Sequence, residues 1–260
     1  MRISVLLIGA LACTGCFQMT TVMKVGGDGG GTIEHRMLFT TAALLQLKQL
    51  SALGGGNGRT ADPVSEDQAR TMADTLGPGS SYVTSRPFES PIGRGRDATY
   101  AFTDVSQLRL SSQPAVPGGV SIKAQDFSTE SEAVTFSITH EANGNAVLHV
   151  HVPEPNFLDA LGPPSAAGRL GMIRTALAGA RVLLTVEPTG TLVRTSSPYV
   201  DGPRVTLLEV NLDDALKDET LLRRLQAAPN VDEAKAVIKD VPGLKINLDR
   251  DITVELTPLK

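Results

Sequence analysis

The chain has almost no cysteine. Its 260 residues include only Cys13 and Cys16, so no cysteine follows Cys16. A disulfide framework is therefore excluded from everything after that position. Thiols found only near the start of a chain are more typical of an attachment point than of a structural crosslink.

Aromatic residues and positive charge are also scarce. There is no tryptophan, there are three tyrosines and seven phenylalanines, and the formal net charge is −4. Without a cationic field or stacking surfaces, nucleic acid is not an expected partner. The hydrophobic share of 41% and the charged share of 20% are typical of folded proteins. The length allows one large domain or two smaller ones.

A short apolar run stands at the N-terminus. Arg2 precedes the apolar residues 3–12, and small residues follow before Cys16. This pattern predicts an export signal over residues 1–15. The run is too short for a permanent transmembrane helix, which needs about 20 apolar residues.

The sequence LACTGC at residues 11–16 resembles the bacterial lipobox. The resemblance implies cleavage before Cys16 and attachment of diacylglycerol, and in addition palmitate, to that cysteine. Cys13, preceded by Leu11 and Ala12, is the alternative lipidation site. The expected localisation is the bacterial cell envelope, with the anchor in the outer membrane or on the outside of the inner membrane.

Periodicity predicts strands and helices along the rest of the chain. Alternating apolar residues indicate strands, and apolar spacing of three and four residues indicates helices. Residues 19–25 and 32–40 are expected to form a hairpin around the glycine-rich turn at 26–31, and residues 89–96 are expected to form a loop. Thr41 and Ser65 are the expected caps of the helices that follow them. Asn143 and Gly144 suggest a hairpin turn, and a three-residue loop there would place the apolar side chains of both strands on one face. The predicted strands cover residues 19–25, 32–40, 82–88, 99–102, 134–139, 146–151, 181–187, 191–195, 204–210 and 244–256; the predicted helices cover 41–53, 65–76, 166–178, 219–227 and 231–239.

This order predicts an α+β fold, with antiparallel or mixed β-sheets and helices packed on one side. Residues 16–110 form a predicted N-terminal β-β-α-α-β-β unit. Residues 111–129, rich in Ser, Gln, Pro and Gly, are a predicted linker or long connection. Residues 130–260 form a predicted C-terminal α+β unit.

Two segments carry a family resemblance. The run VMKVGGDGGGTI at residues 22–33, followed by a helix and by YAFTD at residues 100–104, resembles the LppM-type envelope lipoproteins. The similarity covers about residues 17–110. It implies a β-rich α+β domain on a lipid anchor, without enzymatic activity and without catalytic residues to carry over.

Two sets of side chains are candidate sites. Arg86, Arg94 and Arg96 surround a predicted loop, where they could meet an anionic lipid headgroup; the alternative is a charged loop. His149 and His151 lie on one face of a predicted strand, which is a weak signal for zinc because a third ligand is needed. Solvated surface histidines are the simpler interpretation, and no cofactor is expected.

The sequence predicts a non-catalytic, membrane-tethered module that binds a lipid, a glycan or an envelope protein. It contains no Gly-x-Ser-x-Gly elbow, no phosphate-binding Gly-x4-Gly-Lys loop and no His-Glu-x-x-His pair. A small envelope hydrolase with an unrecognised site is one alternative. A purely structural lipoprotein is another.

Overall fold

The first two strands form an antiparallel pair, and the first of them begins at Phe17. The computed structural model describes residues 17–45, 48, 62–110, 133–152, 179–215, 217–228, 231–247 and 249–258. In it, β1 (Phe17–Val25) pairs with β2 (Gly31–Thr40), and Met23 lies opposite Ile33. Both of these side chains are fully buried, whereas Lys24 on the other face remains partly exposed. The predicted hairpin is confirmed.

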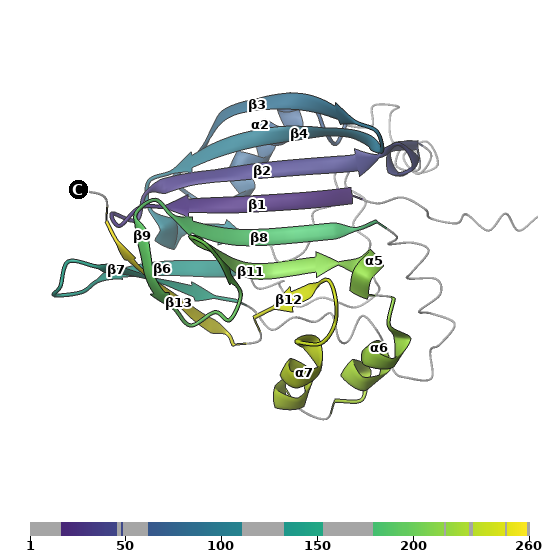
Figure 1. The fold of residues 1–260 in the computed structure, drawn as a ribbon. Coiled ribbons are helices and arrows are strands. Elements are labelled where there is room, and N and C mark those ends of the chain that lie inside the picture. Colours follow the sequence, from purple (N-terminus) through teal and green to yellow (C-terminus); the bar gives the residue numbers. More distant parts are fainter. Residues whose placement is uncertain are drawn as a thin grey trace, which may run out of the picture.

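This hairpin is the centre of a mixed sheet, which we call sheet A (Figure 1). The order in sheet A is β10-β11-β8-β1-β2-β4-β3, and β12 also pairs with β11. β1 and β8 are parallel, and the other described pairs are antiparallel. The added strands are β3 (Ser80–Ser90), β4 (Gly93–Phe102), β8 (Arg181–Pro188), β10 (Val200–Asp201), β11 (Arg204–Asn211) and β12 (Leu244–Ile246). Strands from both predicted units therefore share one sheet.

A second, antiparallel sheet, sheet B, contributes to the same core. Its order is β5-β6-β7-β13-β9, and the short helix η1 (Val105–Gln107) precedes β5. Apolar side chains of sheet B and of sheet A belong to one buried cluster, which includes Met23, Ile33, Phe136 and Leu148. We call this side of sheet A its inner face. The strands of sheet B are β5 (Arg109–Leu110), β6 (Val134–His140), β7 (Ala146–His151), β9 (Thr191–Thr195) and β13 (Asp251–Thr257).

The β6–β7 hairpin confirms a register predicted from the sequence. Ile138 lies opposite Leu148, and Glu141 donates its backbone N–H to the carbonyl of Asn145, at 2.8 Å. These contacts leave a three-residue loop that contains Gly144 at φ +87°. A two-residue loop would have moved apolar side chains of one strand to the wrong face, so burial decided the register.

The helices lie on one side of sheet A, as predicted. In α2 (Glu66–Thr75), the hydroxyl of Ser65 accepts from the backbone N–H of Gln68 at 3.1 Å, which confirms the predicted cap. α7 (Val231–Ile238) packs through Val237 and Ile238 on the same inner face, against β11 and β12. Two further helices are α5 (Leu212–Ala215) and α6 (Glu219–Gln226). The fold is α+β.

Tyr100 ties α2 to sheet A. It is fully buried on β4, and its hydroxyl donates to the carbonyl of Ala69 in α2 at 2.9 Å. Burial raises the pKa of Tyr100 to about 12, so the hydroxyl stays a neutral donor.

Tyr100→Phe should therefore lower the free energy of unfolding by about 1 kcal/mol. Urea denaturation of this variant and of Tyr82→Phe would measure the effect. The Tyr82 hydroxyl, bonded to Ser85 at 2.8 Å, is only partly buried and should contribute less. Equal decreases in the free energy of unfolding of the two variants would mean that the hydrogen bond from Tyr100 to α2 contributes no more than the partly buried one of Tyr82.

Two predicted segments were wrong. The loop expected over residues 89–96 is a tight turn at Pro91 and Ile92, because β3 and β4 continue to Ser90 and from Gly93. The single strand expected over residues 244–256 is β12 in sheet A and β13 in sheet B. Buried Asn247 follows β12 and donates to the carbonyls of Thr206 and Leu207, which ends the first strand.

The helix expected from residue 41 is described only in part. Residues 41–45 are helical, and Thr40, not Thr41, caps them by accepting from the backbone N–H of Ala43 at 3.2 Å. The expected linker at 111–129, the expected helix at 166–178, and the signal region with Cys13 and Cys16 lie outside the described residues.

Candidate functional site

The outer face of sheet A carries rows of charged side chains. Because side chains alternate along a strand, residues next to the buried ones point to this face. Four acidic residues meet six basic ones there. The ion pairs are Lys24–Glu34, Arg36–Asp97, Arg86–Asp97, Arg204–Glu187, Arg181–Glu209 and Lys245–Glu209. In these ion pairs the basic partners outnumber the acidic ones, although the whole chain is acidic.

Arg36 is held in place among these ion pairs by two neighbouring side chains. It lies opposite Asp97 on the neighbouring strand, and its Nε is 3.1 Å from the Asp97 carboxylate. Its guanidinium also lies 4.3 Å from the centre of the Phe88 ring, a cation–π distance. Arg86 shares the same carboxylate at 3.4 Å. Two guanidinium groups therefore meet one carboxylate, which leaves one positive charge unbalanced locally.

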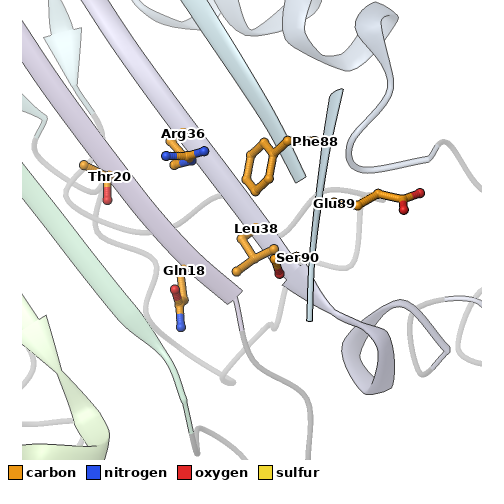
Figure 2. A pocket seen from close by; sticks show the side chains of 7 residues that line it. All are labelled: Gln18, Thr20, Arg36, Leu38, Phe88, Glu89 and Ser90. Carbon is orange, nitrogen blue, oxygen red and sulfur yellow. The ribbon is translucent and has the colours of Figure 1, made fainter. Parts of the chain in front are cut away.

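A half-open hollow of about 310 Å³ lies beside Arg36 (Figure 2). It has an apolar part, formed by Leu38 and Phe88, and a polar rim. Glu89 borders the hollow, but its carboxylate points away from the other side chains. The remaining lining residues are Gln18, Thr20, Arg36 and Ser90.

Glycines on β4 create this hollow. Gly93 and Gly95 lie opposite Thr40 and Leu38 of β2 and opposite Ser90 and Phe88 of β3. Neither glycine has a side chain, so at these positions β4 leaves its outer surface open between the side chains of β2 and β3. A Cβ at Gly95 would collide with the Phe88 ring and with the carbonyl oxygen of Met37. The Phe88 ring is therefore seated against the backbone of β4.

The three arginines predicted as a headgroup site do not come together. Arg86 is on the outer face, whereas Arg94 and Arg96 alternate with it and are on the inner face. Arg94 pairs with Asp62 at 3.1 Å, and Arg96 donates to the carbonyl of Val64 at 2.7 Å. The sequence missed Arg36, Leu38 and Phe88 as neighbours of Arg86, because residues 89–96 were interpreted as a loop. The alternate glycines of β4 were the available signal.

The histidines do not converge either. His149 contacts the Thr139 hydroxyl at 3.2 Å, and His151 contacts Asp251 at 2.9 Å. His140 lies on the opposite face of the hairpin and contacts the carbonyl of Gly27 at 2.8 Å. Across the described ranges, no group of three or more His, Cys, Asp or Glu side chains is arranged to hold a metal ion.

A buried carboxylate in sheet B is held by fixed donors. Glu255 on β13 is only 5% exposed; the Asn145 amide donates to it at 2.6 Å, and Arg194 also pairs with it. The hydrogen bonds from Asn145 and then Arg194 lower the pKa of Glu255, so the group stays ionised. Such a carboxylate is a structural acceptor and a poor general acid.

Buried Ser197 is bonded to neutral groups: its hydroxyl lies 3.0 Å from the Asn247 side chain and 3.4 Å from the carbonyl of Thr206. These contacts connect the segment before β10 to β11. None of them involves a histidine, so they describe a structural network.

Comparisons with known proteins give one weak similarity. No protein-family model and no curated protein match the sequence. A structure comparison finds the folded domain of LppM from Mycobacterium tuberculosis, solved by NMR, with 9% identity and a TM-score of 0.32. The match covers 94% of this chain and 91% of that one. A similarity of this strength carries no argument about function.

Within the described ranges, no helix is both long enough and apolar enough to cross a bilayer.

Proposed function

We propose that this protein is a lipid-anchored envelope protein whose outer face binds an anionic, amphipathic ligand. The lipobox-like sequence before Cys16 supports the anchor. The observation that supports binding is the hollow beside Arg36, where two arginines share one carboxylate next to the apolar side chains of Leu38 and Phe88. No catalytic role is assigned to any residue of the hollow.

The chemistry of the hollow favours a phosphate or carboxylate attached to an apolar group. Arg36 is 57% exposed and retains donors that Asp97 does not use. An anion there would form charge-assisted hydrogen bonds, and the apolar part would cover Leu38 and Phe88. Pockets of roughly 300 Å³ are at the small end of ligand sites, so the hollow fits a headgroup and the first carbons of a chain.

The test uses residues 17–260 and two soluble probes, dihexanoyl phosphatidylglycerol and glycerol 3-phosphate. Calorimetric titration should detect the first probe, and Arg36→Gln should weaken it about tenfold by removing one charge-assisted contact. Arg204→Gln is the matched control, because Arg204 is 54% exposed on the same face and pairs with Glu187 at 2.8 Å.

Each result has one meaning. Equal affinity in the wild type and in Arg36→Gln would contradict the proposed site. Binding of the lipid probe alone would identify a lipid headgroup with its apolar neighbour as the ligand. Comparable binding of glycerol 3-phosphate would identify a free phosphate compound instead.

A further inference from the structure

One end of sheet A gathers the segments nearest to Cys16. β1 begins there at Phe17, β2 ends there at Thr40, and the β3–β4 turn lies beside them (Figure 1). The backbone N–H of Thr41 donates to the carbonyl of Ile92 at 3.1 Å, which joins the two neighbouring segments. We call this the proximal end: Phe17, residues 40–45, and the turn at Pro91 and Ile92.

The proximal end presents apolar side chains to the surface. Ile92 is 49% exposed, and Leu45 is 57% exposed. At the same end, Phe39, Ala43 and Val64 form a small buried cluster with Phe17 and Leu44 packed against it. Single exposed apolar residues are ordinary. Here, however, two of them lie next to segments that carry an apolar cluster: Ile92 accepts from the backbone of Thr41, and Leu45 follows Leu44.

The opposite end has different chemistry. The β1–β2 turn there consists of glycines around Asp28, whose side chain accepts from the backbone N–H of Gly30 at 3.1 Å. The β6–β7 loop extends at the same side of Figure 1 and carries the exposed residues Glu141 and Asn143. The two loops at this end are therefore polar, whereas the turn and helical segment nearest to Phe17 expose Ile92 and Leu45. The other exposed large apolar side chains, Val83, Val193 and Val200, lie on strands.

Chain geometry limits how far a lipid on Cys16 can be from the proximal end. One trans peptide separates Cys16 from Phe17, so their Cα atoms are about 3.8 Å apart. Neighbouring strands are about 4.8 Å apart, and the β3–β4 turn lies two to three strand spacings from β1, which is roughly 10–14 Å. An acyl anchor without a linker holds this end within reach of the bilayer surface.

We infer that the proximal end rests directly on the membrane, with Ile92 and Leu45 inserted at the level of the headgroups. This inference depends on the proposed function, because it requires the lipid on Cys16. The acyl chains hold the protein on the membrane, and the apolar end sets its orientation. Since Gln18 and Ser90 of the hollow belong to the strand ends at this side, the hollow then opens close to the headgroup layer.

The orientation can be measured on the full-length, lipidated protein in vesicles of phosphatidylethanolamine and phosphatidylglycerol. Ile92→Cys and Asn143→Cys provide matched labelling positions, because both are exposed turn or loop residues at opposite ends. Bimane on residue 92 should emit at shorter wavelength and be quenched by spin-labelled phospholipid at least about twofold more than bimane on residue 143. Equal quenching at both positions would overturn the inference.

A second measurement separates the two proposals. Mass spectrometry of the N-terminal peptide, compared with Cys16→Ser, tests lipidation alone. An unmodified Cys16 would overturn the anchor and the docking inference together. A lipidated Cys16 with a solvent-exposed label at residue 92 would overturn only the docking inference. Ile92→Asp should reduce the quenching of a label at residue 91, introduced as Pro91→Cys, which connects the signal to the apolar side chain.

Discussion

Replacing Gly95 by alanine should lower the free energy of unfolding by about 3 kcal/mol, because the new methyl group has no space. A Cβ at this position would meet the carbonyl oxygen of Met37 on β2 and the ring of Phe88 on β3. The backbone oxygen belongs to the β2–β4 ladder and cannot move without loss of pairing. The Phe88 ring would have to leave its seat beside Arg36.

The control for this prediction is Gly144→Ala. Gly144 has φ +87°, and nothing lies within 4 Å of the position where its Cβ would be. The free energy of unfolding of Gly144→Ala should fall by only about 1 kcal/mol, which is the cost of a left-handed backbone conformation for a residue with a side chain. Chemical denaturation of both variants gives the difference. Similar losses would show that the packing around Gly95 is not tight.

Acid should destabilise the protein through His35. This residue is 5% exposed on the inner face, and its Nδ1 lies 2.9 Å from the Thr21 hydroxyl, while its Nε2 has no hydrogen-bond partner among the residues that the structure describes. Burial lowers the pKa of His35 from 6.5 to about 4, because the charged ring would lose its hydration. The imidazole is therefore neutral in the folded protein at neutral pH.

The sign of the effect follows from proton uptake. Below pH 6.5 the unfolded chain binds a proton at this histidine, whereas the folded chain does not until about pH 4. Stability is thus fully present above pH 6.5 and declines as the pH falls to about 4, by about 3 kcal/mol in total.

Denaturation curves between pH 7 and pH 4 would measure this decline. His35→Gln keeps a polar side chain without a titrating ring, so its stability should decline by about 3 kcal/mol less over the same range. The comparison uses the pH dependence and not the absolute stability of the variant. Identical pH dependence in both proteins would contradict the assignment. An NMR titration of the His35 ring gives an independent value of its pKa.

Local patterns predicted a large part of the fold. The cap at Ser65, the β1–β2 hairpin and the register of Ile138 with Leu148 were all correct. Each depends on neighbours in sequence or on the alternation of one strand pair. Burial of an apolar face leaves few other solutions for such elements.

Predictions that depended on distant partners were less successful. Residues 89–96 looked like a glycine-rich loop, yet Gly93 and Gly95 belong to a strand whose neighbours leave no room for side chains. The segment 244–256 has one continuous apolar pattern, but the bonds of Asn247 to β11 divide it between two sheets. Nothing in the local sequence identifies these partners.

By itself, the sequence determined the fold class of the protein, and it predicts export and a lipid anchor. The absence of cysteine after Cys16, the lipobox-like motif and the strand periodicity are properties of neighbouring residues, so they can be read without a fold. Only the tertiary structure decided which charges meet. Arg86, Arg94 and Arg96 are close in sequence, but strand alternation puts Arg86 on the outer face and the other two inside. Arg36, 50 residues before Arg86, joins it through Asp97 because β2, β4 and β3 are adjacent in sheet A.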